Sequence, residues 1–212
     1  MLLLTLMVSP AVDASLLPAD FDMVFGMFKE FFIGFCCGFV YQIFYYLLLF
    51  AGSIMDTEFG MAMAKVFDPS TNMQTSVTGS IMTALFAIYI MLTDSHLVMI
   101  QLYAISFKLV PIGTISISPD CFKLMLELFV SVFSLVFRLL LPFVVVEFAL
   151  QVVLGIMMKL VPQIHIFVIN FHLKMGMGLI LLILLTPSIA AFMDNYIVIM
   201  LENIQRTMLA FA

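Results

Sequence analysis

The sequence predicts an all-α integral membrane protein built from helical hairpins with kinked and broken helices. Hydrophobic residues make up 65% of the 212 residues, charged residues only 10%, and the mean hydropathy is +1.25. These values lie outside the range of soluble domains and exclude disorder, because disordered chains are polar. Two uncharged runs, residues 31–55 and 69–93, also exceed the roughly 20 residues that cross a bilayer core. The net charge of -5 weighs against nucleic acid as a partner.

The chain begins in a short apolar run, Leu2–Val8. A secretory signal would carry a basic residue before such a run, but the first basic residue is Lys29. The alternative is that the run is the second half of a hydrophobic helix that ends at Pro10.

Two apolar segments in the first half predict helices. Residues 31–55 are uncharged between Glu30 and Asp56 and form the first. The second starts near Thr75, after a polar and turn-prone stretch, and continues to Phe107 with a break at residues 93–95.

The second half begins with a helix-start signal. Ser118 can cap, Pro119 suits the first helical position, and Asp120 lies at the positive end of the helix dipole. A long helix is predicted over residues 121–159, with interruptions at Arg138, Pro142 and Glu147. Two more apolar segments follow, from Pro162 to about Leu185 and from Ile189 to the C-terminus. No sequence repeat is recognisable, and the scattered basic residues leave the topology open.

Four charged residues fall inside or beside apolar segments, where a charge facing lipid is costly. We predict that they are buried against protein or water, either pairing with groups on neighbouring helices and subunits or forming a proton relay. These residues are Arg138, Glu147, Lys159 and Lys174.

The sequence predicts no catalytic, cofactor-binding or metal site, and therefore no enzyme. Phosphate-binding loops, dinucleotide glycine patterns and nucleophile-elbow serines are missing. Cys36 and Cys37 are adjacent on one helix and, with Cys121, are interpreted as packing residues. His165 and His172 share a helical face but lack a third metal ligand nearby.

The stretch that follows the first long helix, GSIMDTEFGMAMAKVFDPSTNMQTS, mixes acids, small residues and methionines with an Asp-Pro break. Such residues can form a loosely helical loop inside protein, where methionine fills irregular gaps. An ordinary polar connection between two helices is the alternative.

Four segments in order carry a family resemblance: GSIMDTEFGMAMAKVFDPSTNMQTSVTGS, SHLVMI, FKLVPIG and VPQIHIFVINFHLKMGMGL. The most specific parts are D-x-x-x-G-x-x-x-A followed by F-D-P, and the later P-Q-x-x-x-F. Together they resemble the FliR family, the flagellar export-gate proteins related to the T component of injectisomes. The resemblance extends from about Leu2 to the C-terminal helix, and it implies that a first hydrophobic helix usual in the family is missing before this point.

The resemblance implies one subunit of a hetero-oligomeric helical pore in the bacterial cell membrane, within the flagellar basal body. Residues 1–115 would form a P-like half and residues 116–212 a Q-like half of one export-gate domain. The implied partners are P- and Q-type subunits, other membrane proteins of the export apparatus, unfolded export substrates and membrane lipid.

The resemblance also implies site residues. A pore plug at about residues 59–75 would contain Phe59, Gly60, Met61, Met63, Phe67, Asp68, Pro69 and Met73. Packing and gate positions would be Asp56, Pro111, Gly113, Pro162, Gln163 and Phe167.

Other functions remain as alternatives to a flagellar export subunit. The first is the equivalent subunit of an injectisome. A secondary transporter would explain the intramembrane charges and broken helices, but it predicts an inverted repeat that the sequence does not display. An intramembrane enzyme would have to use His165, His172, or Asp56 with Glu58, and these do not form a catalytic constellation.

Overall fold

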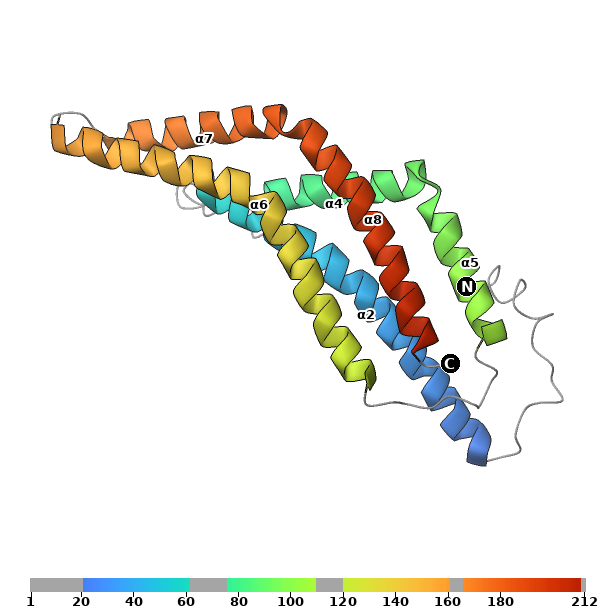
Figure 1. The fold of residues 1–212 in the computed structure, drawn as a ribbon. Helices are drawn as coiled ribbons and strands as arrows, with labels where there is room; N and C mark the ends of the chain where they lie inside the picture. Colours follow the sequence, from blue (N-terminus) through green and yellow to red (C-terminus); the bar gives the residue numbers. More distant parts are fainter. Residues whose placement is uncertain (1–20, 62–75, 110–119, 161–165, 211–212) are drawn as a thin grey trace, which may run out of the picture. The chain divides into compact units, whose positions relative to one another are not determined.

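The computed structural model describes residues 21–61, 76–109, 120–160 and 166–210, and these residues contain helices and turns but no strand (Figure 1). The helices are α2 (Phe21–Glu58), α4 (Val77–Leu92), α5 (Ser95–Leu109), α6 (Asp120–Leu160), α7 (Ile166–Leu184) and α8 (Thr186–Leu209). The predicted all-α class is confirmed, and every helix predicted from residue 31 onwards is present, whereas the apolar run Leu2–Val8 lies outside the described residues. The proposed cap at Ser118 and Pro119 lies outside the described residues, one position before α6 begins.

The order of the elements is repeated, although the sequence shows no repeat. A long helix, α2, is followed by the bent pair α4 and α5, which meet at 72°. A second long helix, α6, is followed by the bent pair α7 and α8, which meet at 61°. The described chain therefore uses the same plan twice: one continuous helix and then one broken helix.

The first break, between α4 and α5, is centred on Asp94. This residue adopts a φ of 54°, in the left-handed region that ends an α-helix. The Thr93 hydroxyl donates to the Tyr89 carbonyl at 2.8 Å and lies 2.7 Å from the Ser95 hydroxyl. These side chains satisfy polar groups that the interrupted helix leaves open. The predicted break at residues 93–95 is confirmed.

The second break, between α7 and α8, falls at Leu185. Pro187 lies in the first turn of α8, where its missing N–H costs no helical hydrogen bond. The Thr186 hydroxyl donates to the Leu182 carbonyl at 2.8 Å. The boundary predicted between Leu185 and Ile189 is therefore confirmed.

The predicted interruption of the long helix near Pro142 is wrong, because α6 is one helix from Asp120 to Leu160 with Pro142 inside it. Proline removes a single hydrogen bond, the one to the carbonyl of Arg138, and Pro142 itself is exposed. Its neighbours Leu140 and Phe143 are buried. Their packing holds the helix together across the missing bond.

The chain divides into two compact units, and neither corresponds to one half of the sequence. The first consists of Met1–Phe44, Ile88–Ser131 and Asn195–Ala212; the second consists of Tyr45–Ala87 and Val132–Asp194. Both long helices contribute residues to each unit. The proposed P-like and Q-like halves remain a prediction, and each compact unit takes helices from both of them.

In the first unit, α2 and α8 pack through an aromatic contact. The Tyr196 ring lies edge-on to Phe44 at a centroid distance of 4.8 Å, and both side chains are fully buried. The Tyr196 hydroxyl donates to the Phe44 carbonyl at 2.8 Å. A buried tyrosine hydroxyl requires such an acceptor, so this pair fixes the register of α8 on α2.

The described residues include two helices long and apolar enough to cross a membrane, Phe31–Glu58 and Phe122–Leu160. Each bent pair also passes this test when its two helices count as one span, which gives up to four spans. These helices confirm the predicted membrane class.

Candidate functional site

The candidate site lies in the second unit, where the C-terminal end of α2 meets the N-terminal end of α4. These two ends flank residues 62–75, which contain most of the predicted plug and lie outside the described residues. The described residues on either side show how this segment is attached to the rest of the unit.

Asp56 of α2 holds the start of α4. Its Oδ2 accepts hydrogen bonds from the Ser76 hydroxyl and the Val77 N–H, each at 2.7 Å. Its Oδ1 accepts one from the Thr78 N–H at 3.1 Å. Asp56 is 6% exposed, so these three bonds satisfy a carboxylate that is almost out of water. A negative charge at this point also complements the helix dipole of α4.

Ser76 is the N-cap of the same helix. Its Oγ accepts a hydrogen bond from the Gly79 N–H at 2.8 Å, the pattern expected of a capping serine. Because the Ser76 hydroxyl in turn donates to Asp56, the α4 cap and the last turn of α2 form one hydrogen-bond network. We call Asp56, Ser76, Val77 and Thr78 the clamp.

Two glycines allow α2 and α4 to approach closely beside the clamp. A Cβ placed on Gly52 would overlap the backbone nitrogen and Cα of Gly79. A Cβ on Gly79 would lie 3.0 Å from the carbonyl oxygen of Leu49 and 2.8 Å from the Ser76 Oγ. Small residues at helix crossings permit this backbone contact in membrane proteins. The crossing therefore requires glycine at position 52.

Phe59, just after the end of α2, packs against both α6 and α7. Its side chain is 1% exposed, lies edge-on to Phe143 of α6 at a centroid distance of 6.1 Å, and packs directly on Gly178 of α7. Gly60 follows with a φ of 76°, a left-handed conformation that ends the helix. Residues 62–75 thus come just after a buried aromatic anchor, Phe59, and a turn at Gly60.

The predicted plug residues fall into two groups. Phe59, Gly60 and Met61 are described; Phe59 is buried, and the other two are half-buried. The remaining plug positions lie outside the described residues: Met63, Phe67, Asp68, Pro69 and Met73. Phe59 is an anchor within the packed unit.

Of the packing and gate positions, Asp56 belongs to the clamp, and Phe167 lies in the first turn of α7. The others lie outside the described residues: Pro111, Gly113, Pro162 and Gln163.

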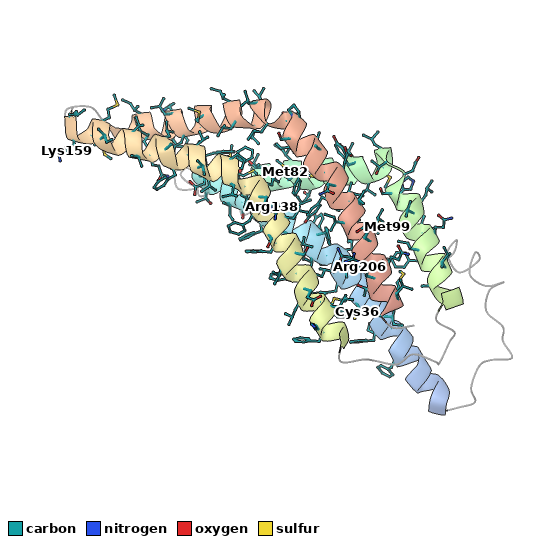
Figure 2. All side chains as sticks on the ribbon, viewed as in Figure 1. Cys36, Met82, Met99, Arg138, Lys159 and Arg206 are labelled. Carbon is teal, nitrogen blue, oxygen red and sulfur yellow. The ribbon has the colours of Figure 1, made fainter. Side chains whose placement is uncertain are left out.

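The four charged residues of the apolar segments lie in different environments. Glu147 is fully buried, Lys174 is half-buried, and Arg138 and Lys159 are exposed. Lys159 lies at the end of α6 that leads to α7 (Figure 2). Burial of Arg138 and Lys159 stays a prediction that concerns an assembly with other subunits, because the single chain does not cover them.

Sequence reasoning did not single out Gly52, Ser76, Gly79 or Gly178. Ser76 has a local signal, since serine before an apolar run is a common N-cap. Glycines in apolar helices indicate close backbone approach in general. Their partners cannot be read locally: Asp56 and Thr78 are 22 residues apart in the chain.

The residues at this junction attach both ends of a chain segment to the rest of the unit. Within the described residues, no group of three or more His, Cys, Asp or Glu side chains could hold a metal ion. The clamp, the glycine crossing and the Phe59 anchor instead hold both ends of one segment at one place.

Replacing Asp56 with alanine is expected to lower the free energy of unfolding by about 3 kcal/mol, because one buried and two part-buried donors lose a charged acceptor. Asp56→Asn keeps one acceptor oxygen and should cost about 1 kcal/mol. Thermal unfolding of the purified protein in detergent measures both. Asp194→Ala is the control, since Asp194 is exposed on α8. Equal losses for Asp56→Ala and Asp194→Ala would contradict the clamp.

Comparison with known proteins identifies the family. The model described as "Bacterial export proteins, family 1" matches residues 1–199. Flagellar biosynthetic protein FliR of Escherichia coli (strain K12) is 29% identical over 198 residues, 91% of this chain and 76% of that protein. FliR of Bacillus subtilis (strain 168) is 25% identical over 181 residues, 84% of this chain and 70% of that protein. Yop proteins translocation protein T of Yersinia pestis is 24% identical over 207 residues, 95% of this chain and 78% of that protein.

The apolar helices and these matches define a membrane component of type III protein export. The chain belongs to the bacterial export proteins, family 1. The resemblance to the FliR family is thereby confirmed. Membership implies that the protein works in association with other components of the export apparatus.

Proposed function

We propose that this chain is a core subunit of the flagellar type III protein export gate, in the cell membrane within the basal body. It forms part of the channel for unfolded flagellar proteins together with P- and Q-type subunits and other membrane proteins of the apparatus. Residues 59–75 contribute a plug. Support comes from the FliR relatives, which match at 25–29% identity in the comparisons above.

The observation that carries the plug proposal is the attachment of residues 62–75 at both ends. Asp56 binds the first N–H groups of α4, and Phe59 is buried at the end of α2. A segment fixed at both ends can be displaced by a passing chain and then return. The proposed plug contains Met61, Met63 and Met73, and methionine suits repeated repacking because its side chain is unbranched and adaptable.

The outer surface of α6 supports assembly with partner subunits. This helix exposes large apolar side chains along much of its length, and such a surface marks contact with protein or lipid. In the proposed gate, neighbouring subunits cover part of this surface and lipid covers the rest. The side chains include Phe122, Leu126, Phe129, Val130, Phe137, Leu141, Val145 and Phe148.

Detergent extraction of the tagged chain from cells that express its native neighbours tests the assembly. We expect P- and Q-type subunits to copurify with it and to be identified by mass analysis. A tagged, unrelated protein with several membrane spans, extracted in parallel, controls for detergent carry-over. Purification as a stable monomer that transports a small solute would contradict the proposal and would favour a secondary transporter.

An injectisome subunit is the second candidate, because the translocation protein T of Yersinia pestis matches 95% of the chain. Deletion of the gene distinguishes the two functions. Loss of motility with secretion of effector proteins intact supports the flagellar function. The reverse result supports the injectisome.

A further inference from the structure

Glu147 is a buried acid with no hydrogen-bond partner in the part of the chain that the structure describes. Its side chain lies on the buried stripe of α6 and has no exposed surface. Both carboxyl oxygens are buried, and neither has a hydrogen-bond partner among the described residues. Buried carboxylates normally accept several hydrogen bonds, as Asp56 does in the same unit. Glu147 therefore needs a different explanation from Asp56.

The charged groups around Glu147 leave it uncompensated. Lys174 on α7 attracts its negative charge, and Glu58 on α2 repels it. No ion pair joins Glu147 to Lys174 within the described residues. Because Glu147 is fully enclosed, a partner subunit cannot reach it in this arrangement.

Among the described residues, the other charged groups of the unit are either hydrogen-bonded or exposed to solvent. On α2, Asp56 is bound to the start of α4, and α4 carries no acidic or basic side chain. His172 on α7 is exposed and packs edge-on against Phe171. The remaining charged side chains of the unit that the structure describes are those of Arg138 and Lys159 on α6 and of Asp194 on α8, and all three are exposed.

The acid lies one helical turn from the Phe59 anchor. Phe59 packs on Phe143, four residues before Glu147 on α6, and on Gly178, four residues after Lys174 on α7. Since residues four apart share a helix face, Glu147 and Lys174 each continue a face that Phe59 contacts. The next residue, Gly60, also lies beside Lys174, because a Cβ placed on it would be 3.9 Å from both Cβ and Cδ of Lys174.

We propose that Glu147 is a proton-binding site that controls the packing of the Phe59–Gly60 turn. In the arrangement seen here, the carboxyl carries a proton, because an ionised carboxylate that is fully enclosed and accepts no hydrogen bond from the described residues is very costly in a protein interior. Release of that proton to solvent leaves a carboxylate, which attracts the Lys174 ammonium. The Lys174 stem then moves away from Gly60, and the turn loosens.

The proton site is independent of whether residues 62–75 seal a channel. Its influence on export, however, rests on the proposed function, because the turn is where the plug segment begins. The two ideas fail separately. A channel that stays closed after deletion of residues 62–72 contradicts the plug, whereas the pH response described next reports on Glu147 alone.

The sequence contains no tryptophan, so Met61→Trp places a single reporter in this chain directly after the turn. The full chain is reconstituted in lipid nanodiscs with the subunits that copurify with it. The spectrum of the same preparation without Met61→Trp is then subtracted. We expect one step in the tryptophan emission as the pH is raised. Glu147→Gln should abolish the step and keep the low-pH spectrum, because glutamine has the shape of the neutral acid.

Two further variants sharpen the test. Lys174→Met removes the compensating charge and should shift the step to higher pH. Glu202→Gln changes an exposed acid on α8 and should leave the step unchanged. A step that persists in Glu147→Gln, or a parent protein with no step, would overturn the proposal.

Infrared spectroscopy provides a second measurement that does not depend on the reporter. The parent protein at neutral pH should show the carbonyl band of a protonated, buried carboxylic acid, and Glu147→Gln should lose it. The amide bands of the same spectra show that the variant is folded. A folded Glu147→Gln variant that retains the carboxylic acid band unchanged would also overturn the proposal.

Discussion

Removing residues 62–72 is expected to leave the assembled gate permeable to ions. The deletion retains Phe59, Gly60 and Met61 on one side and Met73 to Ser76 on the other. The clamp, the glycine crossing and the anchor therefore persist. A short linker can join the two ends, because Asp56 already holds the start of α4 beside the end of α2. Conductance of the purified complex in a planar bilayer measures the leak.

A matched control separates loss of the plug from damage to the complex. Replacing residues 62–72 with a glycine and serine segment of equal length keeps the connection but removes Met63 and Phe67. We expect this variant to assemble and to leak as well, because a flexible polar segment does not exclude water. If both variants assemble with the parent subunits and conduct no more than the parent, residues 62–75 do not seal the channel.

Gly52→Val is expected to have the largest effect on stability of any single substitution at the site. Even a Cβ at this position overlaps backbone atoms of Gly79, and backbone cannot rotate away as a side chain can. The helices must move apart, which also stretches the bonds from Asp56 to α4. Overpacking of this kind costs about 3 kcal/mol or more. The measurement is thermal unfolding in detergent, together with the amount of complex recovered.

Gly38→Val is the control for this substitution. Gly38 is on the same helix, and a Cβ placed there would meet nothing within 4 Å. Both variants add the same β-branched side chain to α2, so the difference between them isolates the crossing with α4. Similar stability of the two variants would show that α2 and α4 do not depend on the close contact.

The helices and their breaks could be predicted because their causes are local. An uncharged apolar run predicted α2, and the start signal at residues 118–120 with the apolar stretch after it predicted α6. The polar residues 93–95 predicted the turn centred on Asp94. Pro142 misled the prediction, since a proline breaks a helix only where the remaining packing is weak. Leu140 and Phe143 supply that packing, and no local pattern indicates how deeply they are buried.

The site could be predicted in part. Asp56 stood out because it follows a long apolar helix, but its role depends on Ser76 and Val77, which are 20 and 21 residues away. Whether Glu147 has a hydrogen-bond partner also depends on how the helices pack, which the sequence does not show. Sequence shows an acid in an apolar helix, but only the packed unit shows that Lys174 approaches without pairing. The predicted roles of Phe67, Asp68 and Pro162 stay predictions, because these residues lie outside the described part of the chain.

The division into two units determines when the protein can fold during synthesis. Neither unit is complete until α6 and α8 have left the ribosome, because each unit includes residues from 132 or 195 onwards. The hydrogen bond from Tyr196 to Phe44 joins residues 152 positions apart. Such distant contacts form late and slow the search for the native state. The first half of the chain therefore remains in the membrane with exposed apolar and polar surfaces until the second half is synthesised. Insertion factors or partner subunits that shield α2 during this interval would raise the yield of folded protein.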